Sequence, residues 1–232
     1  MKKQVMALAL ISVFFTFHGN STCFAQDISQ VDLNKFIAET QLSSGNADQI
    51  KMAWWIPIEF WKIVFSKDQS VSAEQTQTYI NTLSPYVLFA VVDGEVGSFG
   101  GVTYKSYESI KPCIVASDDA NRKFNPLDES ETSADVKNLL DIFKPVIENM
   151  LGQMGQNLHF FVFRDQDSHD KRIFDPFQPG TLHFNVCGED YKWKLPLSCL
   201  LPLKYCPIDH EMMNGAWIYC PWHGEKLLED KK

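Results

Sequence analysis

The sequence lacks the short motifs that mark several large enzyme classes. It contains no Gly-x-Ser-x-Gly nucleophile elbow, no His-Glu-x-x-His helix, no Walker phosphate loop and no Cys-x-x-Cys-His haem site. The glycine-rich stretch 97–101 leads into further strand-like residues and not into a helix, so it is not a dinucleotide-binding fingerprint. Each absence argues against one named activity without excluding enzymes in general.

Positive charge is in deficit. The chain has 21 Lys and Arg residues against 29 Asp and Glu residues, which gives a formal net charge of −8. A nucleic-acid-binding protein would concentrate basic residues on one face, so we expect no nucleic-acid partner. The hydrophobic fraction of 45% and the 17 phenylalanines indicate a packed globular core. The expected partner is therefore an unidentified protein or small molecule.

Long apolar runs are absent apart from one at the N-terminus. Two lysines precede the run from Val5 to Phe17, which is shorter than the ~20 apolar residues of a transmembrane helix. Ala25 supplies a small residue before a cleavage point, so residues 1–25 are predicted to be a signal peptide. A lipid anchor on Cys23 is less favoured, because Asn20 stands where a lipoprotein signal usually has an aliphatic residue. We expect an exported protein, periplasmic or secreted, with no transmembrane segment in the mature chain.

The cysteine count is odd once the signal peptide is removed, because Cys23 is the only one of six to leave with it. Exported proteins normally pair their thiols, and five cysteines cannot all pair within one chain. Cys187 and Cys199 are close enough in sequence to bridge a hairpin, but spacing alone leaves the pairing of Cys113, Cys187 and Cys199 open.

Hydrophobic periodicity predicts four helices, with apolar residues recurring at three- and four-residue steps. Pro57 and Pro145 are expected to kink two of them, and Ser72 to Gln75 forms a capping box at the start of another. The predicted helices lie in 27–45, 47–65, 72–83 and 133–151.

Strand-like alternation follows, interrupted by turn residues. Asp93-Gly94 is expected to close a hairpin between 86–92 and 95–104. Further strands are predicted at 109–116, 159–164, 181–187 and 191–195. Helices grouped early and strands grouped later predict an α+β fold with N-terminal helices, an antiparallel sheet and a C-terminal hairpin. The expected organisation is a domain over 26–202, followed by a small module and charged tail over 203–232.

The most specific chemistry lies at the C-terminus. Cys206-Pro-Ile-Asp209-His210 and Cys220-Pro-Trp-His223-Gly flank the pair Asn214-Gly215. Over about residues 203–226 this resembles the paired knuckles of a zinc ribbon, in which Cys-Pro-x-ligand turns sit on hairpins. The resemblance implies a structural zinc ion. The sequence departs from that pattern in having a single hairpin, Asp209 in place of a second cysteine, and His210 in place of the usual glycine.

A two-residue turn at Asn214-Gly215 would set the pairing of the hairpin. Met213 would then pair with Ala216, Asp209 would lie opposite Cys220, and Cys206 opposite His223. This register favours Asp209 as the fourth ligand, whereas the preference of zinc for imidazole favours His210. The candidate metal ligands are Cys206, Asp209, His210, Cys220 and His223.

One alternative to the metal site stays open. A Cys206–Cys220 disulfide is the main rival to a metal, because an oxidising compartment favours it. In the metal-bound hairpin, Met212, Trp217 and Tyr219 are expected to face inward against the main domain.

A closed four-ligand site is structural and not catalytic. Together with the missing catalytic motifs, it predicts a non-enzymatic binding or assembly protein. The alternative is a periplasmic or secreted metal-dependent hydrolase, which would use a metal-bound water or the carboxylates of the Asp165–Asp170 loop. That loop, with His159, His169 and His183 nearby in sequence, otherwise reads as a solvated polar connection.

Overall fold

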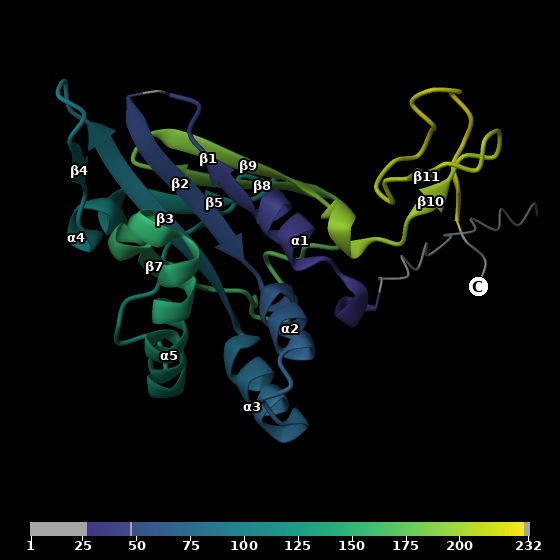
Figure 1. The fold of residues 1–232 in the computed structure, drawn as a ribbon. Helices are drawn as coiled ribbons and strands as arrows, with labels where there is room; N and C mark the ends of the chain where they lie inside the picture. The colour runs from purple at the N-terminus through teal and green to yellow at the C-terminus, as the bar shows by residue number, and fades with distance from the viewer. Residues whose placement is uncertain (1–26, 47, 230–232) are drawn as a thin grey trace, which may run out of the picture.

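A computed structural model describes residues 27–46 and 48–229 (Figure 1). It shows the α+β fold with antiparallel sheets that the sequence predicts. The predicted signal peptide lies outside the described residues. Among the helices of the described part, none is long and apolar enough to cross a membrane.

The central sheet is built around one long strand, β3, which pairs with β2 on one side and with both β4 and β7 on the other. Eight successive residues of β3 are buried, because both faces of the sheet are covered. Its strands are β1 (Gln41–Ser43), β2 (Gln49–Ile56), β3 (Tyr86–Val96), β4 (Val102–Tyr104) and β7 (His159–Arg164).

A second antiparallel sheet covers one face of the first. Its order is β6-β5-β8-β9, with bounds β5 (Ile114–Ser117), β6 (Lys123–Phe124), β8 (Gly180–Val186) and β9 (Glu189–Leu195). The ring of Phe89 on β3 stacks on Phe184 of β8 at 4.2 Å between centroids, and Trp55 on β2 meets Trp193 of β9 at 6.0 Å. The aromatic core of the sandwich therefore lies between the two sheets.

Helices cover the opposite face of the central sheet. Trp54 neighbours Trp55 on β2 and so points the other way, where its ring lies 5.3 Å from Phe60 of α2. Trp61 of α2 in turn packs against Phe143 of α5, at 4.7 Å between ring centroids. The helices are α1 (Leu33–Thr40), α2 (Ile58–Lys67), α3 (Ala73–Leu83), α4 (Tyr107–Ile110) and α5 (Ala134–Met150).

The helices predicted at 72–83 and 133–151 are confirmed as α3 and α5. Ser72 and Gln75 make both bonds of the capping box, and α5 continues through Pro145. The predicted N-terminal helix is shorter than expected, since α1 ends at Thr40 and the chain enters β1. Short 3-10 turns complete the regular structure, at Ile28–Gln30, Lys111–Cys113, Gly152–Asn157 and Ser198–Leu200.

The predicted kinked helix over 47–65 is wrong. Residues Gln49–Ile56 form β2, and α2 begins only at Ile58. Pro57 does not kink a helix but is the N-cap residue of α2. The residue before it, Ile56, keeps the extended backbone of β2, which is the conformation that a residue before proline favours. The apolar residues of β2 recur too densely to distinguish a strand buried on both faces from a helix.

The predicted turn at Asp93-Gly94 is also wrong, because β3 runs straight through it to Val96. The Asp93 carboxylate is buried and accepts a hydrogen bond from Lys105 Nζ at 2.9 Å. Gly94 lies under the ring of Tyr104, whose nearest carbon would stand 2.8 Å from an added Cβ. These two residues serve cross-strand packing, and the chain instead turns at 97–101.

Two other strand predictions need smaller corrections. The strand expected at 109–116 begins only at Ile114, after α4 and a 3-10 turn that contains Pro112. The strands predicted at 159–164, 181–187 and 191–195 are confirmed as β7, β8 and β9 within two residues at each end.

One disulfide joins Cys113 to Cys187, at the ends of the neighbouring strands β5 and β8. The alternative Cys187–Cys199 bridge is therefore not formed, and Cys199 is a free thiol. Burial raises the pKa of the Cys199 thiol, and the neighbouring Glu39 carboxylate raises it further. This thiol is held in its unreactive, protonated form.

Glu39 at the end of α1 fixes the segment that leads to the C-terminal module. Its carboxylate accepts hydrogen bonds from the backbone N–H of Ser198 at 2.7 Å, from the N–H of Cys199 at 3.1 Å, and from the Ser198 hydroxyl. We call this contact the Glu39 clamp. It ties together parts of the chain that are about 160 residues apart.

Candidate metal centre

Residues 203–229 form a small module beside the main body (Figure 1). Its sheet has the order β11-β10-β12, with β10 (Lys204–Tyr205) in the middle, β11 (Met212–Met213) and β12 (Leu228–Glu229). Lys204 pairs with Met213 on one side and with Glu229 on the other. The predicted pairing of Met213 with Ala216 is therefore wrong.

The predicted C-terminal hairpin is present as the antiparallel pair of β10 and β11, but its turn differs from the prediction, and a second turn of the same construction follows it. We call residues 206–211 the first knuckle and residues 220–225 the second knuckle. In the first, the N–H of Cys206 donates to the carbonyl of Glu211 (3.0 Å), and the N–H of His210 donates to that of Cys206 (2.9 Å). In the second, Cys220 donates to Glu225 (2.7 Å), and Gly224 donates to Cys220 (2.9 Å). Asn214-Gly215 does turn the chain, but at the base of the module, between the two knuckles.

Because the two knuckles match position by position, the second knuckle shows which role Asp209 and His210 each correspond to in the first. Position five is His210 in the first knuckle and Gly224 in the second, and both have left-handed backbones, with φ of 61° and 69°. The His210 ring lies over Tyr205, 6.2 Å between centroids, and takes no part in the cluster of donors. Asp209 occupies the position that corresponds to His223. The resemblance to zinc-ribbon knuckles already put Asp209 at a ligand position and His210 at the glycine position, and the repeated Cys-Pro-x-x-x-Glu spacing agrees with it.

The two knuckles bring three donors to one point. Ligand atoms of Cys206, Cys220 and His223 all lie within 4.8 Å of one another, and together they can hold a metal ion. The Nδ1 atom of His223 is 3.4 Å from the sulfur of Cys206 and 3.6 Å from that of Cys220. A carboxylate oxygen of Asp209 stands 3.6 Å from the same nitrogen. Both thiols are buried and unpaired, so the structure does not form the rival Cys206–Cys220 disulfide.

Backbone N–H groups point at the sulfur atoms. The N–H of Ile208 donates to Cys206 Sγ at 3.5 Å. Burial acts against a thiolate at Cys220, but N–H groups of His223 and Trp222 outweigh it and lower the pKa of that thiol. At Cys206 burial dominates and raises the pKa. Metal binding requires the thiolate form, and these N–H groups are already placed to stabilise it.

The module has little apolar core of its own. Its buried hydrophobic cluster consists of the two candidate ligands Cys206 and Cys220 together with Met213 and Leu227. The prediction that Met212, Trp217 and Tyr219 face inward is wrong, because all three side chains are exposed. The base is packed more tightly, since a Cβ on Gly215 would come within 2.2 Å of the Pro202 carbonyl oxygen.

The carboxylate that begins the Asp165–Asp170 loop is committed to a buried ion pair. Arg172 donates from Nε to Asp165 at 2.9 Å and from its two terminal nitrogens to Glu59 at 2.8 and 3.2 Å. The second oxygen of Asp165 accepts the Phe174 N–H at 2.7 Å. Burial raises the pKa of Asp165 in spite of the adjacent guanidinium. This network joins α2 to the loop and has a structural role.

The remaining residues of this region also have structural partners. Asp167 is half-buried and accepts the N–H groups of His169 and Lys171, which orders a turn. His159 Nε2 lies 3.0 Å from the Lys105 carbonyl oxygen, and His183 is a strand residue opposite Lys192. The structure does not bring these side chains into the cluster at the C-terminus.

No family model, no curated protein and no solved structure matches this chain. The assignment of the site therefore rests on its own geometry and chemistry.

Proposed function

We propose that the C-terminal module holds a structural zinc ion through Cys206, Asp209, Cys220 and His223. The observation that carries this proposal is the convergence of two thiols and an imidazole at the tips of two matching knuckles. Two sulfur donors and one nitrogen donor suit zinc better than the hard cations, which take oxygen ligands.

Asp209 is the best candidate for the fourth ligand. It holds the position in the first knuckle that His223 holds in the second, and its carboxylate already lies beside the His223 ring. Zinc accepts carboxylate oxygen in a tetrahedral site, although less often than sulfur or nitrogen in structural sites. With four protein ligands the coordination sphere is closed, and no position remains for a reacting water.

We further propose that the protein is an exported, non-enzymatic binding or assembly protein. The Cys113–Cys187 disulfide supports export, because disulfides persist in oxidising compartments. The many exposed apolar side chains of the module support a binding role, because such patches mark interaction sites. The zinc ion would then hold this surface in shape.

One observation keeps a metal-dependent hydrolase as the second candidate. Only Cys206, Cys220 and His223 meet within 4.8 Å, so an ion bound by these three alone would carry a water in its fourth position. The two candidates differ in whether Asp209 or a water completes the site.

Metal analysis of the purified, exported protein tests the proposal. We expect about one zinc per chain in the unaltered protein and in His210→Ala, which removes the neighbouring imidazole that lies outside the cluster. Cys206→Ser should lose the ion, and Asp209→Ala should bind it at least tenfold more weakly, a typical effect for a residue that supports a metal site. X-ray absorption at the zinc edge should show two sulfur ligands and no water.

Two results would overturn the proposal. One is a metal-free protein in which mass spectrometry finds Cys206 joined to Cys220. The other is a zinc-bound water in the unaltered protein, together with a hydrolytic activity that is lost in Cys206→Ser while the fold is kept, which would establish the hydrolase.

A further inference from the structure

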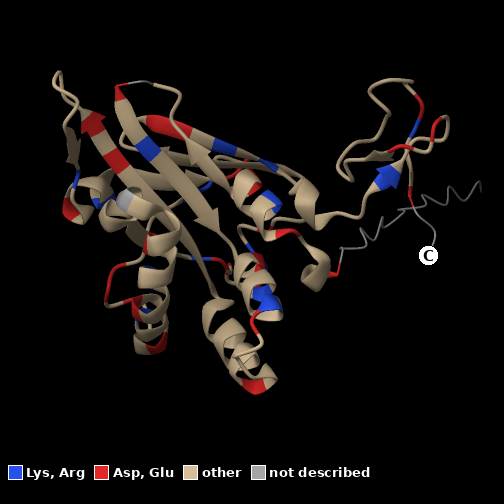
Figure 2. Ribbon diagram, viewed as in Figure 1, with Lys and Arg blue, Asp and Glu red and all other residues tan. Residues whose placement is uncertain are grey.

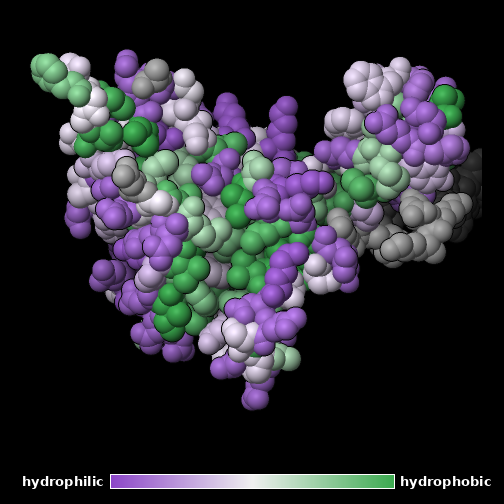
Figure 3. Space-filling view, viewed as in Figure 1, coloured by the Kyte–Doolittle hydropathy of each residue, from purple (hydrophilic) through white to green (hydrophobic). Residues whose placement is uncertain are grey.

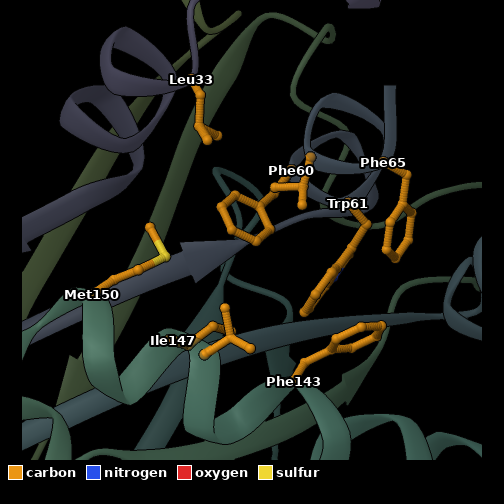
Figure 4. A pocket seen from close by; sticks show the side chains of 9 residues that line it. Leu33, Phe60, Trp61, Phe65, Phe143, Ile147 and Met150 are labelled. Carbon is orange, nitrogen blue, oxygen red and sulfur yellow. The ribbon is translucent and has the colours of Figure 1, made fainter. Parts of the chain in front are cut away.

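An apolar groove runs between α2 and α5 on the helical side of the molecule (Figure 4). Its volume is about 140 Å³, and its nine lining residues are all apolar: Leu33, Phe60, Trp61, Val64, Phe65, Phe143, Val146, Ile147 and Met150. Trp61 is buried beneath it, whereas Val146 and Met150 on α5 are at least half exposed. Figure 3 shows apolar side chains gathered along α5 and towards α2. A groove lined only by apolar side chains can accept an apolar side chain of a partner.

The C-terminal module presents a matching protrusion. Ile208 and Trp222 hold the same position in the two knuckles, directly after Cys-Pro, and both are strongly exposed. Trp222 is 73% exposed, the largest value among the aromatic side chains of the module. Tryptophan is the residue most often found as the energetic centre of an interface. We call the Ile208–Trp222 pair the knuckle tip.

Charges of opposite sign lie near these two surfaces. Exposed Glu211 and Glu225 end the two knuckles that carry the tip. Lys62 on α2 and Lys144 on α5 adjoin the groove residues Trp61 and Phe143, and Figure 2 shows positive charge along α2. Opposite charges around an apolar contact favour the correct orientation of two molecules.

The two lysines are only partly neutralised within the chain. Lys62 lies 3.7 Å from Glu59, which is already paired with Arg172, and Lys144 lies 3.7 Å from Glu148. Both lysine side chains remain more than two-fifths exposed, so they can meet carboxylates of a partner.

The knuckle tip does not occupy the groove of its own chain. Figure 1 shows the module standing apart from α2 and α5. Its base is packed on Pro202 through Gly215, and the Glu39 clamp fixes the segment before it. Within residues 27–46 and 48–229, the tip and the groove therefore do not cover each other, and each can meet a second molecule.

We propose that the knuckle tip of one molecule inserts Trp222 into the α2–α5 groove of a second copy of this chain. The contact is heterologous, because the tip and the groove are different surfaces, so a joined pair still has one free tip on one molecule and one free groove on the other. Repetition of the contact produces a ring or a chain of copies. The proposal rests on the proposed function, since the zinc ion holds the two knuckles in register.

Sedimentation of the zinc-loaded protein over a range of concentrations tests the contact. We expect reversible association that Trp222→Ser and Val146→Asp each weaken about 30-fold, the equivalent of the roughly 2 kcal/mol of an interface hot spot. Phe99→Ser is the matched control, because Phe99 is fully exposed on the distant 97–101 turn and should not affect association.

Mixing the two variants gives the sharpest test. The Trp222→Ser chain keeps an intact groove and the Val146→Asp chain keeps an intact tip, so an equal mixture should form one-to-one pairs that neither variant forms alone. Met150→Asp provides a second groove variant if Val146→Asp is misfolded by circular dichroism. Zinc content is measured on every sample, and Trp222→Ser should retain the full amount.

Three outcomes would overturn the contact: an unaltered protein that stays monomeric up to millimolar concentration, association unchanged in Trp222→Ser, or a mixture that does not pair. Zinc content reports separately on the proposed function. Absence of zinc would refute that function, whereas full zinc content with no pairing would refute only the contact.

Discussion

Removal of the metal is expected to unfold the C-terminal module while the main body stays folded. The module has its own small cluster of buried residues, separate from the core between the sheets and helices. Two of the four residues in this cluster are the thiols proposed as ligands. A chelator therefore removes the centre of the module without touching the core of the body.

The apolar contacts of the module are too few to replace the ion. Met213 and Leu227 are its only buried apolar side chains besides the two cysteines. Burying a side chain of this kind contributes about 1.5–3 kcal/mol. Ordering one residue costs about 1–2 kcal/mol, so the two side chains offset the ordering of only a few residues. Structural zinc contributes about 10–16 kcal/mol in comparable small sites, which exceeds what the two side chains supply together.

Amide NMR spectra with and without chelator measure the effect residue by residue. We expect signals from residues 203–229 to collapse into the narrow range of unfolded chains, while signals from the two large sheets stay in place. Limited proteolysis should then cut only beyond residue 202. Cys206→Ser should reproduce this behaviour, and Cys199→Ser should not, because Cys199 lies outside the cluster.

One result would refute this reasoning. If the reduced, metal-free protein kept dispersed module signals and resisted proteolysis, the knuckles would be stable without an ion, and zinc could not be their structural support.

Other parts of the molecule allow three further predictions, each measured by urea unfolding. Arg172→Met should lower the free energy of unfolding by about 3–5 kcal/mol, because it leaves two buried carboxylates without their cation; a loss below about 1 kcal/mol would contradict the buried network. Replacing Cys113 and Cys187 by Ala should cost about 2–5 kcal/mol in non-reducing buffer, and none once the unaltered protein is reduced. Partial burial opposes ionisation of Asp118, but hydrogen bonds from Arg122 hold the pKa of this carboxyl below its ordinary value. Its stabilising effect is thus full above the unfolded pKa of about 3.9 and is lost as pH falls through the lower folded value. Asp118→Asn should therefore destabilise the protein at pH 7, and this effect should shrink as the pH is lowered below about 3.9; an effect that does not change with pH would contradict this.

Local signals predicted α3, α5 and the strands β7, β8 and β9, but not β2 or the path of β3 through Asp93-Gly94. The capping box at Ser72 and the apolar stripe of α5 depend only on neighbouring residues, so the sequence is enough to find them. The 49–56 segment is buried on both faces, and its apolar residues satisfy a helical pattern equally well. Asp93-Gly94 has the composition of a hairpin turn, but contacts with Lys105 and Tyr104 across the strand decide its conformation.

The candidate metal cluster was predicted better than its backbone. The sequence indicated that Cys206, Cys220 and His223 come together, and the structure places them so. The predicted register failed because it relied on the Asn214-Gly215 turn. Aligning the two Cys-Pro segments instead matches His210 with Gly224, and a glycine at that position indicates a left-handed backbone and not a metal ligand.

The Glu39 clamp determines how the protein would respond to a pull on its C-terminal end. Three hydrogen bonds to one carboxylate hold the segment before the module against α1, and α1 in turn contributes Phe36 and Thr40 to the buried interior. A force applied to the C-terminus is therefore expected to act first on α1, through the Glu39 clamp. Only after the clamp breaks would the force act on β9, at the edge of its sheet. Glu39→Gln would weaken that anchor, and the edge strand would become the first element to detach under load.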